Sequence, residues 1–145
     1  APFDAAISPL AAVTGLDNAR LLQHTDARSI FFRFLRENHR VLTSAGIELG
    51  RIGPFHPDTV DRILRLPLIA RAMAPGFARS LRNTYCSMSG DIERGRTEID
   101  YFNGYLVRLA GGVDCPLNQR ACDVVKRMES ACATPSLDRL RDMAA

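Results

Sequence analysis

The sequence predicts an all-α domain of about six or seven helices. Apolar residues recur at spacings of three and four, which is the period of an amphipathic helix, and no useful length of chain alternates apolar with polar residues as a strand would. At 145 residues with 46% hydrophobic content, the chain can bury one sizeable core without a second domain. We therefore expect one helical domain covering residues 1–145.

The first two expected helices occupy the N-terminal third of the chain. Small and apolar side chains predict a helix over residues 3–13, ended by Gly15, which can adopt the left-handed geometry of a helix C-terminus. The next helix begins at Asp26 or Ser29 and ends at Gly46. Its apolar side consists of Ile30, Phe31, Phe34, Leu35, Val41 and Leu42.

The middle of the chain carries weaker helical patterns. Residues 50–57 are rich in helix breakers and predict a loop, after which Asp58 opens a short helix. Another helix is expected over residues 76–88, followed by a looser segment around Gly90.

The strongest single pattern predicts a helix from Thr97 to Gly111, with Thr97 as its N-cap residue. Glu98 and Asp100 then fall in the first turn, where the helix dipole alone favours acidic residues. Gly104 costs about 1 kcal/mol relative to Ala inside a helix, so we expect it to mark a close contact with another helix. The apolar side of this helix consists of Ile99, Phe102, Leu106 and Ala110, whereas Asp100 and Arg108 face elsewhere.

Two further segments complete the expected fold. Residues 113–116 form a connector, and the next helix begins at Asn118 or Asp123. Val124, Val125 and Met128 form the apolar side of that helix. Residues 134–136 then separate a polar tail that forms a last short helix.

Charge and hydropathy exclude several classes of function. The net charge of +3 is small and its basic residues are spread along the chain, so no nucleic-acid-binding patch is expected. No segment has the roughly 20 apolar residues of a membrane span, and the first residues lack the charged start of a signal peptide, so we expect no export. Because the chain starts at Ala1 rather than Met, we expect a fragment of a longer protein. The only lysine, Lys126, is expected on a solvated helix face.

The cysteines indicate a reducing compartment rather than a metal site. No two of them form a CxxC pair and the histidines lie elsewhere in the chain, so we expect no zinc. We expect a cytoplasmic protein whose thiols are free and buried. These thiols are Cys86, Cys115, Cys122 and Cys132.

Several motifs together resemble one enzyme family. They are Ser87-Met88, the segment GDIERGRTEIDYFNG at residues 90–104, the segment CPLN at residues 115–118, and VVK at residues 124–126. Their order resembles the C-terminal domain of ketopantoate reductases, also called 2-dehydropantoate 2-reductases. The resemblance covers nearly the whole chain and implies a fold like the C-terminal domain of 6-phosphogluconate dehydrogenase.

The resemblance implies that this chain is one half of an enzyme. It implies either an enzyme that uses NADP to reduce ketopantoate to pantoate in pantothenate biosynthesis or a related 2-oxo acid reductase. An N-terminal Rossmann domain, which these residues lack, binds the cofactor through a Gly-rich loop. The helical domain shapes the substrate pocket and often pairs two subunits, which implies a homodimer. The lysine that donates the proton, and the asparagine that follows it, match positions upstream of Ala1, so the isolated chain is expected to be inactive.

Five positions in this chain match functional or recurrent polar positions of the family. Ser87 matches the serine that binds the substrate carboxylate, and Glu98 matches the glutamate that accepts a hydrogen bond from the substrate hydroxyl and orients the lysine. Asp91 and Asn103 match polar positions that support the site or pack a helix. Asp4 departs from the asparagine usual at its substrate-binding position, and its carboxylate would repel an anionic 2-oxo acid unless an arginine compensates. The segment before Thr97 is also one residue shorter than in many relatives.

A second hypothesis stays open at this stage. The chain could be a stand-alone helical domain that binds a ligand or another protein without catalysing a reaction. The carboxylate of Asp4 and the single lysine favour this alternative.

Overall fold

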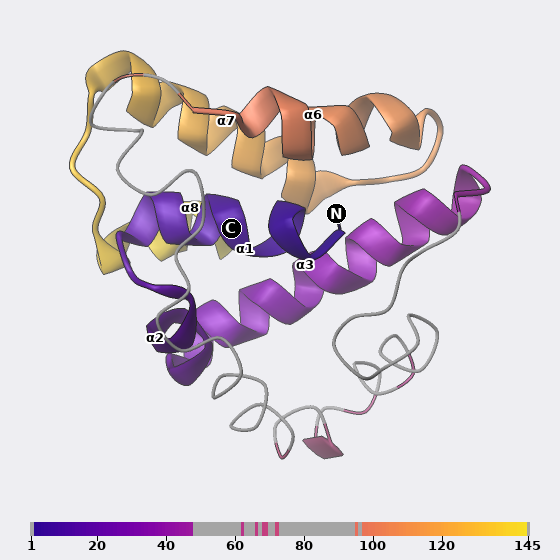
Figure 1. Cartoon of the computed structure of the whole chain (residues 1–145), viewed down its shortest axis with the longest axis horizontal. Coiled ribbons are helices and arrows are strands. Elements are labelled where there is room, and N and C mark those ends of the chain that lie inside the picture. The colour runs from indigo at the N-terminus through magenta and orange to yellow at the C-terminus, as the bar shows by residue number, and fades with distance from the viewer. Residues whose placement is uncertain are drawn as a thin grey trace.

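The computed structural model describes residues 2–47, 62, 66, 68, 69, 72, 95 and 97–144, and for residues 2–4 it describes the backbone alone. The expected helices that open at Asp58 and span residues 76–88 lie outside these residues. Every element of the described part is a helix, which confirms the all-α prediction (Figure 1). The elements are α1 (Pro2–Thr14), α2 (Asn18–Gln23), α3 (Thr25–Ser44), α6 (Ile99–Ala110), α7 (Pro116–Ala131), the 3₁₀-helix η1 (Leu137–Arg139) and α8 (Leu140–Ala144).

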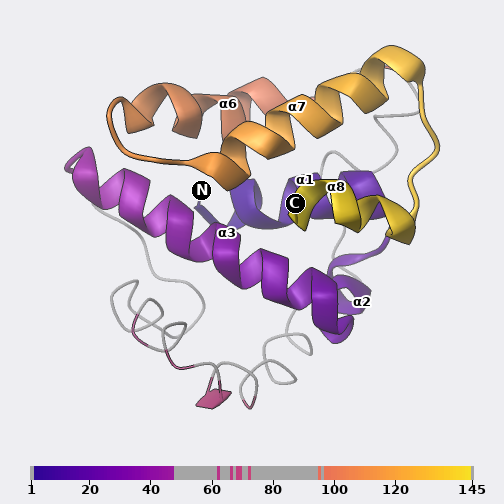
Figure 2. The ribbon, with the colours of Figure 1, turned by 180° about the vertical axis from the view of Figure 1, so that it is seen from behind.

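Helix α1 lies in the middle of the fold. It packs against α3 on one side and against α6 and α7 on the other, and Figure 1 and Figure 2 show this arrangement from opposite sides. A helix that is apolar all round must be buried, and residues 5–14 of α1 are all buried. Small side chains such as Ala5, Ala6, Ala11 and Ala12 let neighbouring helices approach its backbone. The position of α1 therefore follows from its composition.

Helix α1 ends as its sequence predicts. The Gly15 N–H donates to the Ala11 carbonyl at 2.8 Å, and Gly15 has a φ of +74°. This left-handed geometry favours glycine. A Cβ at Gly15 would also lie 3.2 Å from the Cβ of Pro135, so the C-terminal segment closes over this turn.

Helix α2 was missed by the sequence prediction, which placed no helix between Gly15 and Asp26. Asp17 caps α2 by accepting a hydrogen bond from the Arg20 N–H at 2.8 Å. His24 ends α2 and begins α3, and its Nδ1 accepts from the Ala27 N–H at 3.4 Å. The predicted start of α3 at Asp26 or Ser29 was therefore late, whereas its predicted end at Gly46 is confirmed by a φ of +73°.

Helices α6 and α7 form an antiparallel pair beside α1 (Figure 2). The predicted apolar side of α6 is confirmed, since Ile99, Leu106 and Ala110 are buried and Phe102 packs against the core. Helix α7 begins at Pro116, earlier than the predicted Asn118 or Asp123. The N–H group at the first position of a helix has no partner within the helix, so proline, which lacks this group, is favoured there.

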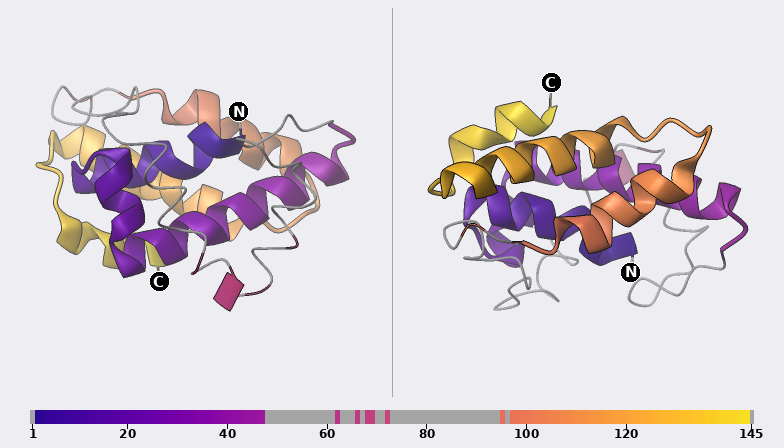
Figure 3. Two further views of the ribbon diagram at one scale, coloured as in Figure 1. Left: turned by 60° about the horizontal axis from the view of Figure 1, so that its bottom comes forward. Right: turned by 90° about the horizontal axis from the view of Figure 1, so that it is seen from above.

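The C-terminal tail, which the sequence predicted to be a polar segment, also packs into the core. The predicted last short helix exists as η1 and α8, and it contributes Leu140 and Met143 to the core. The Ser136 N–H donates to the Val13 carbonyl at 2.9 Å and ties this tail to the end of α1. Helix α8 packs beside α7, as the view from above in Figure 3 shows.

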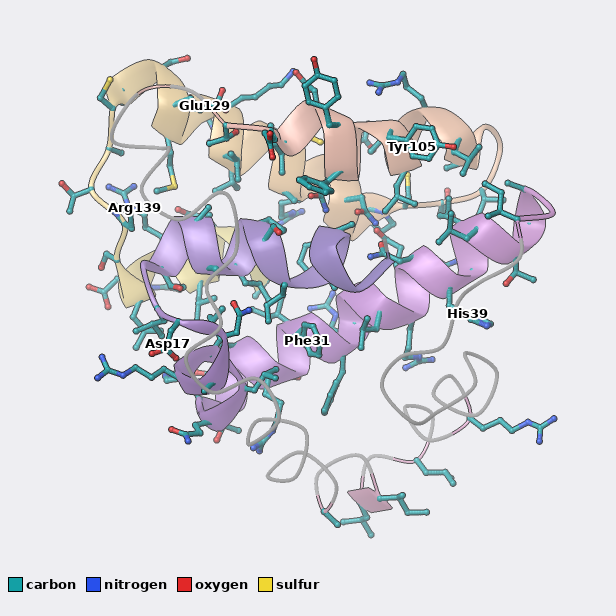
Figure 4. The ribbon with its side chains drawn as sticks, in the orientation of Figure 1. Asp17, Phe31, His39, Tyr105, Glu129 and Arg139 are labelled. Atoms are coloured by element: carbon teal, nitrogen blue, oxygen red, sulfur yellow. The ribbon has the colours of Figure 1, made fainter. Side chains whose placement is uncertain are left out.

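The core is one large apolar cluster with a smaller one beside it. Phe31 and Phe34 of α3 are the largest fully buried side chains, and Figure 4 shows Phe31 between α3 and α1. Val124, Val125 and Met128 are buried as predicted. No helix of the described part combines the length and the apolar character that crossing a bilayer requires.

Candidate functional site

Glu98 lies at the N-terminus of α6, where its side chain is exposed to solvent. Its carbonyl accepts the first hydrogen bonds of the helix, from the Tyr101 N–H at 3.0 Å and the Phe102 N–H at 3.4 Å. The predicted N-cap residue, Thr97, is therefore off by one position. The Glu98 side chain makes no capping hydrogen bond, while the Thr97 hydroxyl accepts from the Ile99 N–H at 3.4 Å.

The chain that leads into α6 is held against the last turns of α7 by three contacts. The Thr97 hydroxyl donates to the Glu129 carboxylate, and Figure 4 shows Glu129 on α7 beside this segment. The Asp100 carboxylate pairs with the Lys126 ammonium at 2.8 Å. A Cβ built at Gly95 would lie 3.1 Å from the Cys132 sulfur. Glu98 is thus flanked on both sides by residues that α7 holds.

Lys126 is exposed, as predicted, and its partner is Asp100. The hydrogen bond from the ammonium to this carboxylate, followed by their charge attraction, raises the pKa of Lys126. Such a lysine stays protonated. It belongs to a surface ion pair and does not act as an amine nucleophile.

Asn103 is fully buried and joins α6 to α1 and α7. Its Nδ2 donates to the Ala5 carbonyl at 2.7 Å and to Asn118 Oδ1 at 2.8 Å. In a helix, the Ala5 carbonyl would accept from the N–H of residue 9, but residue 9 is proline and has no N–H. The Asn103 side chain therefore replaces the hydrogen bond that Pro9 removes from α1. This contact places the first turn of α1 against α6.

The same buried network continues into α3. The Glu37 carboxylate accepts from the Leu117 N–H at 3.0 Å and the Asn118 N–H at 2.8 Å, which are free donors at the start of α7. The Asn118 Nδ2 atom donates to Glu37 at 2.6 Å and to Asn38 Oδ1 at 2.7 Å. The negative charge of Glu37 also lies at the positive end of the α7 dipole. Four helices are thus joined by one polar network inside an apolar core.

Gly104 does not have the role that the sequence predicted. It is buried, but the three atoms nearest to a Cβ at this position belong to Asp100 and Arg108 of the same helix, at 3.3 to 3.5 Å. The Arg108 guanidinium also donates to the Asp100 carbonyl at 3.1 Å. Glycine here leaves room for these two charged side chains to cross the helix surface.

The other predicted site residues lie partly outside the described structure. Ser87 and Asp91 are outside the described residues. Asp4 lies in the first turn of α1, where only its backbone is described, next to the Ala5 carbonyl that Asn103 binds. The structure therefore brings together α6, which carries Glu98, and the turn that carries Asp4.

The described cysteines are all free thiols, as predicted, but they are not all buried. Cys115 is buried, Cys122 is partly buried and Cys132 is exposed, where it ends α7 with a φ of +46°. Burial raises the pKa of Cys115, and burial followed by the nearby charge of Asp100 raises that of Cys122 to about 11. These two thiols are unreactive at neutral pH. Among the described residues, no three His, Cys, Asp or Glu side chains are grouped as metal ligands would be.

A groove of about 410 Å³ lies elsewhere on the molecule, between the start of α3 and the C-terminal tail. Its walls carry both Arg33 and Arg141 and both Asp26 and Asp138, so it favours no sign of charge. None of the predicted site residues lines it.

Sequence reasoning missed the polar groups inside the core. Glu37 and Asn38 follow Phe34 by three and four positions, which places them on the apolar side of α3. A polar pair at such positions signals a buried network, because burial without partners would be costly. The same argument applies to Pro9, whose presence in a predicted helix demands another donor for the Ala5 carbonyl.

The described part contains no strand, and the sequence contains no Gly-rich loop after one. Comparison with known protein families matches residues 2–129 to the ketopantoate reductase PanE/ApbA C-terminal domain. No curated protein matches the chain significantly. No solved structure does so either.

Proposed function

The chain belongs to the ketopantoate reductase family of C-terminal domains, and we propose that it is the substrate-binding half of an NADP-dependent 2-oxo acid reductase. The observation that carries the proposal is the family match over residues 2–129, which includes the segment around Glu98. The remaining half is an N-terminal Rossmann domain of the same protein, which holds NADP. The bound cofactor supplies a hydride to the ketone carbon of the substrate.

The chemical task of this chain is to position the substrate and to control a proton. Ser87 donates a hydrogen bond to the substrate carboxylate, a role suited to a small neutral hydroxyl. The Glu98 carboxylate accepts a hydrogen bond from the hydroxyl group of the substrate. It also lies beside the ammonium of a lysine upstream of Ala1, which it keeps protonated and able to donate to the forming alkoxide.

The exposure of Glu98 supports this role. A carboxylate at a helix N-terminus can be explained by capping, but the capping oxygen at α6 comes from Thr97. The Glu98 side chain is exposed, where a second domain and a substrate can reach it. The described part of the chain thus presents Glu98 without needing it to cap the helix.

We further propose ketopantoate as the substrate, with pantoate as the product. The chain folds as a single domain, pairs with a second copy and works in the cytoplasm, where its free thiols stay reduced. Asp4 replaces the asparagine usual at a substrate-binding position and lowers affinity for the anionic substrate unless an arginine neutralises it. Without the Rossmann domain and the lysine, the isolated chain has no activity.

The experiment is steady-state turnover of the full-length protein with NADPH and a panel of 2-oxo acids that includes ketopantoate. We expect turnover with one or more of them, and we expect Glu98→Ala to lower kcat by about 100-fold while NADPH binding stays intact, because general acid–base groups contribute on this scale. Asp123→Ala, which removes an exposed carboxylate from α7, is the matched control and keeps normal kinetics.

Two results would count against the proposal. A wild-type protein that oxidises no NADPH with any 2-oxo acid favours the alternative of a non-catalytic binding domain. A Glu98→Ala protein with normal kcat removes Glu98 from the mechanism.

A further inference from the structure

We propose that Thr97 and Glu129 position Glu98, so that α7 sets the geometry of the catalytic carboxylate. The inference rests on the proposed function of Glu98 and adds two residues to which that function assigns no role. The Thr97 hydroxyl donates to the Glu129 carboxylate, and this contact joins residues 32 positions apart.

Glu98 needs such support because it lies at a helix end. A residue at the start of a helix lacks the full set of backbone hydrogen bonds that fixes the interior. Glu98 has a φ of −94° and a ψ of 22°, outside the geometry of a regular helix. The backbone on either side of Glu98 therefore contributes to the direction of its side chain.

Helix α7 fixes that backbone on both sides. Before Glu98, Thr97 is bonded to Glu129 and Gly95 lies against the Cys132 sulfur and the Glu129 carbonyl. After Glu98, Asp100 is paired with Lys126 at 2.8 Å. Lys126 and Glu129 of α7, and Cys132 where α7 ends, are spaced by three positions, so these contacts lie along one side of the helix.

The Thr97 contact is the strongest of the three. The Asp100–Lys126 pair is exposed, with about half of each side chain accessible, and such pairs contribute little. The Thr97–Glu129 hydrogen bond is partly buried and has a charged acceptor, which makes it roughly twice as strong as a neutral one. The Thr97 hydroxyl also accepts from the Ile99 N–H, so one side chain fixes the chain to α7 and to the first turn of α6.

The test is the pH profile of kcat for the full-length protein. Glu98 beside the lysine ammonium raises the pKa of that lysine, and activity falls above this pKa because the proton donor is lost. Thr97→Val removes the hydroxyl but keeps the shape. We expect it to lower kcat about 10-fold to 100-fold and to move the alkaline limb to lower pH, in the same direction as Glu98→Gln.

Conservative variants separate positioning from folding. Thr97→Ser keeps the hydroxyl and Glu129→Gln keeps an acceptor oxygen, so both retain the wild-type pH profile. Glu129→Met removes the acceptor and reproduces Thr97→Val, and it serves as the test if Thr97→Val does not fold. Circular dichroism at 222 nm over the same pH range separates a shifted limb from partial unfolding, because stability itself depends on pH. Thr43→Val, at an exposed position of α3, is the control and leaves the profile unchanged.

The outcomes distinguish the two proposals. A shifted profile for Glu98→Gln with an unshifted one for Thr97→Val and Glu129→Met overturns the positioning role and leaves the proposed function standing. Normal turnover and an unshifted profile for Glu98→Gln overturn the proposed function, and the positioning role falls with it. If both are right, the double variant Thr97→Val/Glu98→Gln is no worse than Glu98→Gln alone.

Discussion

Replacing Asn103 with alanine removes two hydrogen bonds, because the Nδ2 group donates to the buried Ala5 carbonyl of α1 and to the buried Oδ1 atom of Asn118. The Ala5 carbonyl depends on Asn103 only because Pro9 cannot donate to it. Changing Pro9 to alanine restores an N–H at the position from which a helix donates to residue 5. The two substitutions should therefore be coupled, although residues 9 and 103 are far apart in the sequence.

The magnitude follows from the hydrogen bonds lost. A buried oxygen left without a donor costs about 1 to 3 kcal/mol, so Asn103→Ala loses about 2 to 6 kcal/mol from its two acceptors. Removing the amide oxygen of Asn103, which is buried without a partner in the described part of the chain, offsets some of this cost. In a Pro9→Ala background the Ala5 carbonyl keeps a donor. Asn103→Ala should then cost about 1 to 3 kcal/mol less.

The assay is urea unfolding of the chain, followed by circular dichroism at 222 nm, for the wild type, both single variants and the double variant. The cavity left by Asn103→Ala is present in both backgrounds and cancels in this cycle. In a parallel thermal scan of the same variants, we expect Asn103→Ala to lower the melting temperature by about 2 to 4 °C for each kcal/mol lost. A coupling energy below about 0.5 kcal/mol refutes the link between Pro9 and Asn103.

Two further predictions concern Glu37 and Cys122. Glu37→Gln places an amide N–H₂ against the backbone donors of α7, so we expect the free energy of unfolding in urea to fall by about 1 to 3 kcal/mol. The control, Asp123→Asn on the exposed side of α7, should change that free energy by less than about 0.5 kcal/mol. Burial, followed by the charge of Asp100, raises the pKa of Cys122 from 9.0 to about 11, so the unfolded thiol ionises first and stability falls as pH rises between these values. Urea midpoints at pH 8 and pH 10 should therefore differ less in Cys122→Ala than in the wild type, and equal differences would contradict the buried state of this thiol.

The main helices could be predicted from the sequence because their apolar sides repeat over several turns. Helices α1, α3, α6 and α7 are each long enough for this period to show. Helix α2 has six residues, which is too short to show a repeating apolar side. The only local signal for it is its N-cap residue, Asp17. The start of α7 was predicted too late, although proline is common at the first position of a helix and Pro116 could have indicated it.

The contacts around the candidate site could not be predicted in the same way. The bond between Thr97 and Glu129 spans 32 positions, and the bond between Asn103 and Ala5 spans 98. No local pattern encodes such pairs, because they depend on how the helices pack. The sequence showed the polar residues themselves, and the fold determined their partners.

The two explanations of Glu98 can be separated by comparing stability with activity. If the helix dipole alone accounts for this carboxylate, removing its charge costs about 0.3 to 1 kcal/mol of stability and leaves turnover unaffected. If Glu98 faces the substrate and the lysine, Glu98→Gln costs little stability and much turnover. The Thr97 hydroxyl accepts from the Ile99 N–H at the start of α6 and donates to Glu129 of α7, so hydrogen bonds other than capping by Glu98 also hold this segment. Unfolding and turnover measured on the same Glu98→Gln protein therefore decide between the helix dipole and the substrate.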